Sequence, residues 1–311
     1  MIVLTLFAME TLFGSALRCG LFVALALTNA GGSRSPLAHA GPPPQAAAPT
    51  TDAAPPKPGQ VVHETLTMMS KALGERRRIH LYTPPGFAKL AGPLPVLYLL
   101  DGGDEEDFPH PGVLAAIDLA IRTGEMRPLA VVGIENTERR RDTTGPTQVD
   151  KDKQIAAHVG GSAAFRAFIR DELMPMVKQK VPRAGKTAIA GESLAGLFVI
   201  ETLFVEPGLF DTWIAVSPSL WWNDQALARE ADRWMKAHPR ATGTLYLARA
   251  GDDIGEPIDA LAAALRSSAP PGLSWYYEPR SDLRHSNIYE NVAPALVRRL
   301  WPPAGGEPRM K

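Results

Sequence analysis

A serine at position 193 lies in the sequence Gly191-Glu192-Ser193-Leu194-Ala195-Gly196, between two apolar stretches. The stretch before it, 187–190, has the length and composition of a buried strand, and 194–205 that of a core-facing helix. A tight strand-to-helix turn needs small residues two positions before and after its serine, and Gly191 and Ala195 are small. The pattern is typical of a hydrolase nucleophile, with a chance match in an ordinary loop as the alternative.

A serine hydroxyl needs a neighbouring base to become a nucleophile near neutral pH, and imidazole is the usual one. His285 lies in a polar loop, 282–287, between a strand-like stretch and the last apolar helical stretch. In a sheet built from alternating strands and helices, such a loop lies at the edge where ligands bind. We therefore predict that His285 is the base, with His110 as the rival near a strand end. A purely structural histidine is the alternative.

An acid that orients the imidazole is expected in the segment Gly251-Asp252-Asp253-Ile254-Gly255-Glu256, which follows an apolar strand-like run. An acid here gives the chain order serine, acid, histidine, which doubly wound serine hydrolases use. We favour Asp253. Asp252, Glu256, a serine–histidine dyad and an acidic turn without a catalytic role remain alternatives.

Hydrolysis of an ester also needs backbone N–H groups aimed at the developing oxyanion. We predict that Leu194, directly after the serine, supplies one, and that Gly103, in the loop after strand 96–100, supplies the other. The acidic residues of 101–107 do not have the spacing of an EF-hand. We therefore expect no metal and no organic cofactor.

The positions of these residues depend on the elements around them. Short apolar runs predict strands covered on both faces, preceded by an antiparallel hairpin. The predicted strands are 61–68, 76–82, 96–100, 129–134, 187–190, 213–216, 244–250 and 274–278. The predicted helices are 113–122, 163–180, 194–205, 224–237, 258–266 and 288–300. This alternation predicts a three-layer α/β sandwich with a mainly parallel sheet and antiparallel leading strands.

The rest of the 311-residue chain indicates an exported protein. Residues 1–40 have a basic residue, an apolar run and a small-residue cleavage site, which is typical of a signal peptide. Residues 41–60 are rich in proline and alanine and predict a disordered linker. We expect the folded domain at 61–302, a loose tail at 303–311, and a periplasmic or secreted location.

Charge and cysteine content exclude several classes of function. The formal net charge is zero, which gives no electrostatic basis for binding nucleic acid or, after removal of the signal, a membrane. The single cysteine, Cys19, has no partner for a disulfide. A small-molecule substrate is therefore the expected partner.

Several segments together resemble the putative-esterase branch of the α/β-hydrolases, which includes esterase D and the enterobactin-type siderophore trilactone esterases. The resemblance covers about 61–300. It depends on 96–102, 132–142, 191–196, Ser217-Pro218-Ser219-Leu220-Trp221-Trp222 and His285-Ser286. It implies an α/β-hydrolase fold in which Ser193 and His285 transfer an acyl group to water.

The arginine and tryptophan segments look most like those of periplasmic esterases that open catecholate siderophore trilactones. Arg139, Arg140 and Arg141 are candidates to hold catecholate or carboxylate oxygens, and Trp221 and Trp222 to receive an aromatic acyl group. Solvated arginines and core-packing tryptophans are the alternatives.

We therefore expect an exported serine esterase that hydrolyses a siderophore ester, in ferric or iron-free form, through an acyl-serine. The alternatives are a general carboxylesterase, a feruloyl or acetyl carbohydrate esterase, and a non-catalytic protein that binds an aryl ligand on a hydrolase fold.

Overall fold

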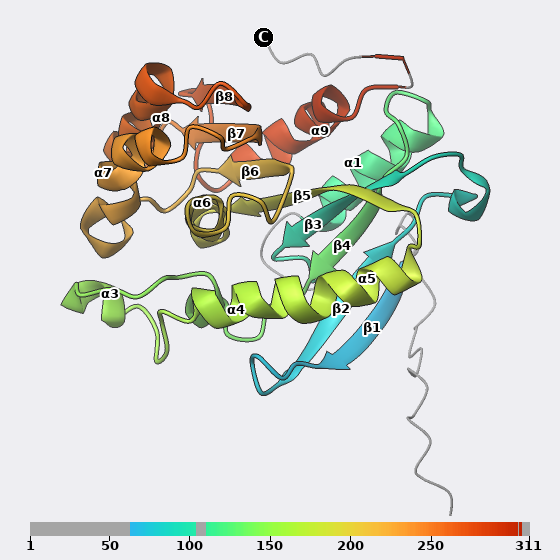
Figure 1. Ribbon diagram of the computed structural model, residues 1–311, viewed down its shortest axis with the longest axis horizontal. Helices are drawn as coiled ribbons and strands as arrows, with labels where there is room; N and C mark the ends of the chain where they lie inside the picture. Colours follow the sequence, from blue (N-terminus) through green and yellow to red (C-terminus); the bar gives the residue numbers. More distant parts are fainter. Residues whose placement is uncertain (1–62, 104–109, 304, 307–311) are drawn as a thin grey trace, which may run out of the picture. The chain divides into compact units, whose positions relative to one another are not determined.

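The computed structural model describes residues 63–103, 110–303 and 305–306, all within one compact unit, Ala48–Lys311. These residues form an eight-stranded sheet in the order β1-β2-β4-β3-β5-β6-β7-β8 (Figure 1). The strands are β1 (Glu64–Met69), β2 (Arg76–Tyr82), β3 (Leu94–Leu100), β4 (Ala130–Ile134), β5 (Ala184–Glu192), β6 (Thr212–Val216), β7 (Gly243–Ala250) and β8 (Leu273–Arg280). Strands β1 and β8 are the two edges of this sheet.

The strand directions are those expected of an α/β-hydrolase. Strands β1, β2 and β4 pair antiparallel, and β4, β3, β5, β6, β7 and β8 pair parallel. The central strands β3 and β4 are almost wholly buried, because their apolar side chains face helices on both sides of the sheet. The predicted mainly parallel sandwich with antiparallel leading strands is confirmed.

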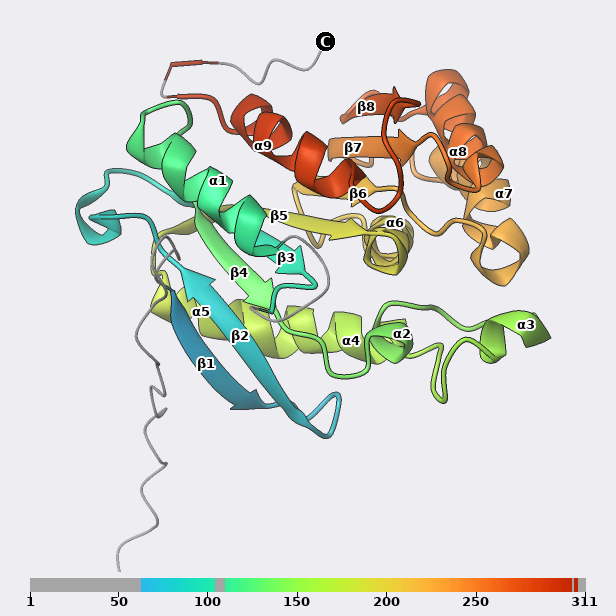
Figure 2. The ribbon, with the colours of Figure 1, turned by 180° about the vertical axis from the view of Figure 1, so that it is seen from behind.

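Helices lie on both faces of the sheet and make two separate cores (Figures 1 and 2). Helices α1 (His110–Arg122) and α9 (Ile288–Leu300) cover one face. The opposite face is covered by α4 (Ser162–Phe168), α5 (Met174–Lys180), α6 (Leu194–Val205), α7 (Trp222–Ala237) and α8 (Gly255–Ser268). The parallel strands all end at one edge, so the loops that follow β3, β5, β6, β7 and β8 meet there.

Several helical segments differ from the predictions, and α1 begins at His110, three residues earlier than predicted. The predicted helix 163–180 contains a π-helical turn, Ile169–Leu173, between α4 and α5. In helix α7 the first residue, Trp222, is followed by three residues of positive φ, Asn223, Asp224 and Gln225, so its regular part starts later than predicted. Helix α8 starts at Gly255, earlier than predicted, which places Glu256 inside a helix rather than in a loop.

Short elements without a detectable sequence period were not predicted. They are the 3₁₀ turn Phe87–Lys89 and the helices α2 (Arg139–Asp142) and α3 (Asp150–Lys153). The predicted signal peptide, the linker and most of the tail lie outside the described residues. Among the helices that the structure describes, none has the length and apolar character needed to cross a membrane.

Candidate active site

Ser193 lies at a sharp turn between β5 and α6, with backbone angles φ 58° and ψ −120°. This is a strained conformation for a residue with a side chain. A Cβ on Gly191 would lie 2.6 Å from the main-chain carbon of Ala195, so the turn has room only for glycine there. The strained turn leaves Ser193 half-buried at the carboxyl edge of the sheet.

Ser219, in the loop after β6, contacts Ser193 twice. Its N–H donates to the Ser193 carbonyl at 2.9 Å, and the two hydroxyl oxygens are 3.2 Å apart. Among the described residues, no hydrogen bond joins Ser193 to His285. The side-chain contact of the Ser193 hydroxyl in this structure is with Ser219.

His285 and Asp253 form a hydrogen-bonded pair at the ends of β8 and β7. His285 Nδ1 lies 2.7 Å from Asp253 Oδ1. The Asp253 side chain is only 4% exposed, and its second oxygen accepts the Ala250 N–H at 2.7 Å. With Nδ1 bound to the carboxylate, Nε2 is the nitrogen left to accept a proton.

This pairing shifts both pKa values. The hydrogen bond to Asp253, opposed by burial, raises the pKa of His285 above its ordinary value. Burial alone would raise the pKa of Asp253, but hydrogen bonds from His285, Ser217 and the Ala250 N–H lower it overall. Asp253 is therefore ionised at neutral pH and stabilises a protonated imidazole.

The other two acids of the segment have different contacts. Asp252 Oδ1 accepts the backbone N–H of His285 at 2.7 Å, so it holds the loop rather than the ring. Glu256 lies in the first turn of α8. His110 is the first residue of α1, and its side chain is outside the described part of the chain.

A pocket of about 200 Å³ opens beside this pair. Its walls include Ser219, Trp221, Asp253, Ile254, Ile258 and His285. Ser219, whose hydroxyl contacts that of Ser193, and His285 therefore line the same small cavity. The other walls of this cavity are partly apolar.

The two tryptophans of the predicted aryl site lie in different surroundings. Trp221 lines the pocket and is half-buried. Trp222 is 4% exposed, and its indole N–H donates to the Gly145 carbonyl at 2.9 Å. The structure thus brings Trp221 to the pocket and packs Trp222 into the core.

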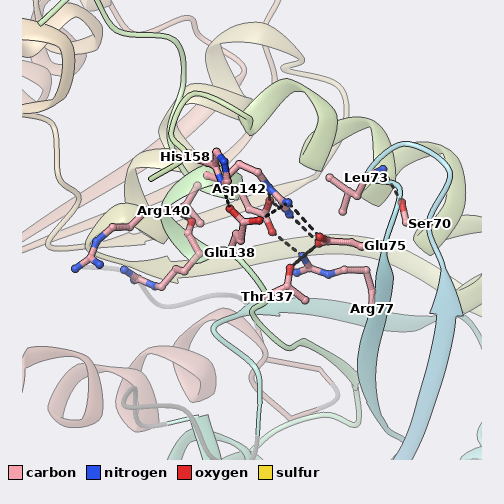
Figure 3. Close-up of polar contacts among 12 residues, drawn as sticks. Ser70, Leu73, Glu75, Arg77, Thr137, Glu138, Arg140, Asp142 and His158 are labelled. Carbon is pink, nitrogen blue, oxygen red and sulfur yellow. Dashed lines mark hydrogen bonds and ion pairs between the residues drawn. The ribbon is translucent and has the colours of Figure 1, made fainter. Parts of the chain in front are cut away.

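The three arginines of α2 also separate. Arg141 binds Glu75 and Asp142, within a network that includes the fully buried Arg77 (Figure 3). Hydrogen bonding to Arg141 is the main reason that the pKa of Glu75 is lowered to about 2. Arg140 is exposed and points away from this network (Figure 3).

Arg139 instead reaches the loop after β3, where Gly103 was predicted as an oxyanion donor. Its guanidinium binds both carboxylate oxygens of Asp101, at 2.6 and 2.9 Å. Asp101 is buried, with φ 53°. A Cβ on Gly102 would lie 2.5 Å from the main chain of Gly133, so the loop approaches β4 closely only because residue 102 is glycine.

Sequence reasoning did not predict roles for Ser217, Ser219 or Glu192. The two serines belong to the Ser-Pro-Ser stretch that contributed to the family resemblance, which was the available signal. Glu192 directly precedes Ser193, is 5% exposed, and burial raises its pKa to about 7. Among the described residues, no cluster of three or more histidine, cysteine, aspartate or glutamate side chains has a geometry that could hold a metal.

Curated relatives with similar sequences are siderophore esterases. The chain is 31% identical over 186 residues to the iron(III) salmochelin esterase of Escherichia coli O6:H1, covering 56% of this chain and 41% of that protein. It is 29% identical over 255 residues to the ferri-bacillibactin esterase BesA of Bacillus subtilis, covering 74% of this chain and 77% of that protein. The chain thus spans less than half of the first relative.

A structure similar to this fold is that of an IroE-like serine hydrolase from Shewanella oneidensis. The TM-score is 0.67 at 23% identity, over 77% of this chain and 80% of the other. The model of the family described as "Putative esterase" matches residues 70–251, which is more than half of the sequence. From this match we conclude that the chain belongs to the putative-esterase family.

Proposed function

We propose that the protein is an exported serine esterase that hydrolyses the ester bonds of a catecholate siderophore through an acyl-serine intermediate. The observation that supports this most directly is the 2.7 Å contact between His285 and Asp253 at the sheet edge where Ser193 occupies its strained turn. Export is proposed from residues 1–40 alone.

In the proposed reaction, His285 Nε2 removes the Ser193 hydroxyl proton while the serine oxygen attacks the ester carbonyl carbon. The N–H groups of Leu194 and Gly103 stabilise the oxyanion that forms. The imidazolium then gives its proton to the leaving alcohol, and the acyl group remains on Ser193. A water molecule, deprotonated by His285, releases the acid and restores the hydroxyl.

The substrate class is proposed from the relatives and from the pocket. The proteins named as relatives act on iron(III) salmochelin and ferri-bacillibactin. In this chain, Trp221 gives the pocket an aromatic wall on which a catechol ring can stack, and the exposed Arg140 is available to an anionic substrate.

The test is labelling of the folded protein with a fluorophosphonate, followed by mapping of the labelled peptide. We expect the label on Ser193 in the wild type and in Ser274→Ala, which removes an exposed hydroxyl at the start of β8. Ser193→Ala should be unlabelled and at least 10³-fold slower with any ester, roughly as for other nucleophile losses, with an unchanged melting temperature. A wild type that resists the label and turns over no ester would contradict the proposal.

The substrate is tested by comparing an iron-free and an iron-loaded catecholate trilactone with p-nitrophenyl, acetyl and feruloyl esters. A higher kcat/KM for the trilactone supports a siderophore esterase. Preference for a simple aryl ester or a feruloyl ester supports the carboxylesterase alternatives. Tight binding of a catecholate without turnover supports the non-catalytic alternative.

A further inference from the structure

Arg139 contacts the ends of two neighbouring strands. It holds the Asp101 carboxylate after β3 with its Nε and Nη2 atoms, at 2.6 and 2.9 Å. The same Nη2 atom donates to the Glu192 main-chain carbonyl, in the last residue of β5, at 3.3 Å. The contacts are sheltered, since the side chains of Arg139 and Asp101 are 19% and 3% exposed.

The strands that end at these contacts carry both proposed oxyanion donors. Strands β3 and β5 are parallel neighbours, with Leu99 opposite Ala190. Gly103 lies two residues after Asp101, and Leu194 lies two residues after Glu192. An oxyanion hole needs its donors at a fixed separation, because a displacement of about 1 Å already costs much of the catalytic effect.

Other contacts fix the same loop. Asn136 Nδ2 donates to Asp101 Oδ1 at 2.7 Å, so the buried carboxylate receives three strong hydrogen bonds. Two of the three come from a planar guanidinium, which matches a carboxylate in both distance and direction. The backbone of Asp101 has positive φ, a conformation that needs such support.

We infer that Arg139 is a positioning residue that sets the separation of the two oxyanion donors, and not a residue that binds the substrate. Its charge is matched by Asp101, whereas Arg140, beside it in α2, is exposed and forms no ion pair with the described residues. The inference rests on the proposed function, since it concerns the same reaction.

The test is Arg139→Lys, which keeps the charge but does not hold two carboxylate oxygens and a carbonyl at once. We expect kcat for neutral p-nitrophenyl acetate to fall by about 10- to 100-fold with KM changed less than twofold, as for a partly lost oxyanion hole. The affinity for a trifluoromethyl ketone, which forms a hemiketal oxyanion on the serine, should fall by a similar factor.

Arg170→Lys is the matched control. Arg170 also binds a carboxylate through two atoms, at 2.8 and 2.7 Å to Asp171, but on an exposed part of the helical segment. It should retain wild-type kcat and wild-type inhibitor affinity. Asp101→Asn, which removes the partner's charge, should reproduce the kcat and inhibitor effects of Arg139→Lys, and the double variant should lose little more than either.

The outcomes separate the two proposals. Two results with an active wild type would overturn the positioning role: an unchanged kcat in Arg139→Lys, or a raised KM of this variant for anionic esters only. The second result would indicate that Arg139 binds the substrate. If Arg139→Lys fails to fold, the same decision is made on Asp101→Asn. A wild type with neither turnover nor fluorophosphonate labelling would overturn the proposed function itself.

Discussion

At the scale of single residues, the structure gives two adjacent acids different contacts. Asp253 touches the imidazole of His285, and Asp252 touches its backbone N–H. Sequence could not distinguish them, because both carboxylates occur in one turn. The orientation of Asp253 depends on the Ala250 N–H and on Ser217, whose hydroxyl lies nearby only in the folded protein.

Asp253→Asn tests whether this contact matters for the reaction. His285 must be neutral to accept a proton, so activity should rise with pH through its raised pKa. Loss of the carboxylate charge lowers that pKa, and the acidic limb of the kcat/KM profile should move to lower pH. The fall in kcat should be roughly 10³-fold, because the ring loses its orienting partner.

The measurement is kcat/KM for a neutral ester between pH 5 and pH 9. Asp252→Asn is the comparison. The acidic limb of its pH profile should move less, since Asp252 contacts the backbone of His285 and the hydrogen bond between the imidazole and Asp253 stays intact. A wild-type profile in Asp253→Asn would favour a serine–histidine dyad.

Glu192 should make stability depend on pH. Burial raises the pKa of its carboxyl from an ordinary 4.5 to about 7. Between these values the unfolded chain releases a proton that the folded protein keeps, so stability falls as pH rises from about 4.5 to 7. In Glu192→Gln this loss is absent. The difference in free energy of unfolding between variant and wild type should grow by about 2–3 kcal/mol from pH 4 to pH 8.

Urea unfolding at the two pH values measures this difference. Equal differences at pH 4 and pH 8 would show that the Glu192 carboxyl ionises in the folded protein as it does in the unfolded chain.

At the scale of elements, the turn between β5 and α6 depends on close approach of its two arms. Gly191→Ala places a methyl group 2.6–2.8 Å from Ala195 atoms, so the turn must open. We expect a loss of about 1–3 kcal/mol in unfolding free energy, as for other overpacked sites, together with slower labelling of Ser193.

Gly208→Ala is the matched control, because its added Cβ meets nothing within 4 Å and its φ is not positive. It should be neutral or slightly stabilising. Both variants are compared by urea unfolding and by the rate of fluorophosphonate labelling. Equal stability and equal labelling would contradict this account of the turn.

The elements that sequence predicted well are those with long periodic or apolar patterns. The strand predicted at 187–190 is part of β5, which runs from Ala184 to Glu192 although Lys186 and Glu192 interrupt the apolar pattern on either side of the predicted stretch. The π-helical turn before α5 was missed because it changes the apolar spacing by only one residue. Pro175 was its signal, since a proline inside a helix has no N–H to donate, and a wider turn accommodates its ring.

Contacts between distant side chains were beyond sequence reasoning. The run Arg139-Arg140-Arg141 indicated positive charge near the site. Because the three residues occupy one helical turn, their side chains point in different directions, and Arg139 binds Asp101 whereas Arg141 binds Glu75. Helix α2 has four residues, which is too short for a periodic pattern to identify it.

At the scale of the whole molecule, a buried ionic network fastens the leading hairpin to the segment after β4. Arg77 in β2 is fully buried and binds Asp142 at 2.6 Å and Glu75 at 3.0 Å. Arg77→Met should lower the free energy of unfolding by about 3 kcal/mol, the low end for a broken buried pair, because the buried Asp142 loses one of its two cations and keeps only Arg141.

Arg78→Met is the control on the same strand. The Arg78 side chain is 56% exposed, and the N–O distance of its ion pair with Glu135 is 3.3 Å. It should change stability by less than about 0.5 kcal/mol. The free energy of unfolding of both variants is measured in urea. Similar losses in Arg77→Met and Arg78→Met would mean that the buried network adds little to stability.

The overall architecture followed from the order of apolar runs along the chain, because right-handed crossovers allow few arrangements of such an order. The position of β4 between β2 and β3 is a detail that the order alone does not give. It places the loop of Asn136 and Arg139 beside the end of β3, which is what brings Arg139 to Asp101.

The edge strand β8 has one further consequence. Its residues Trp275, Tyr276 and Tyr277 form a short aromatic run with high β-propensity, on a strand that pairs on one side only among the residues that the structure describes. Glu278, Pro279 and Arg280 follow immediately. Proline has no N–H to offer an incoming chain, and Glu278 and Arg280 place charged groups on either side of it, so we expect this end of the strand to oppose pairing with a second chain.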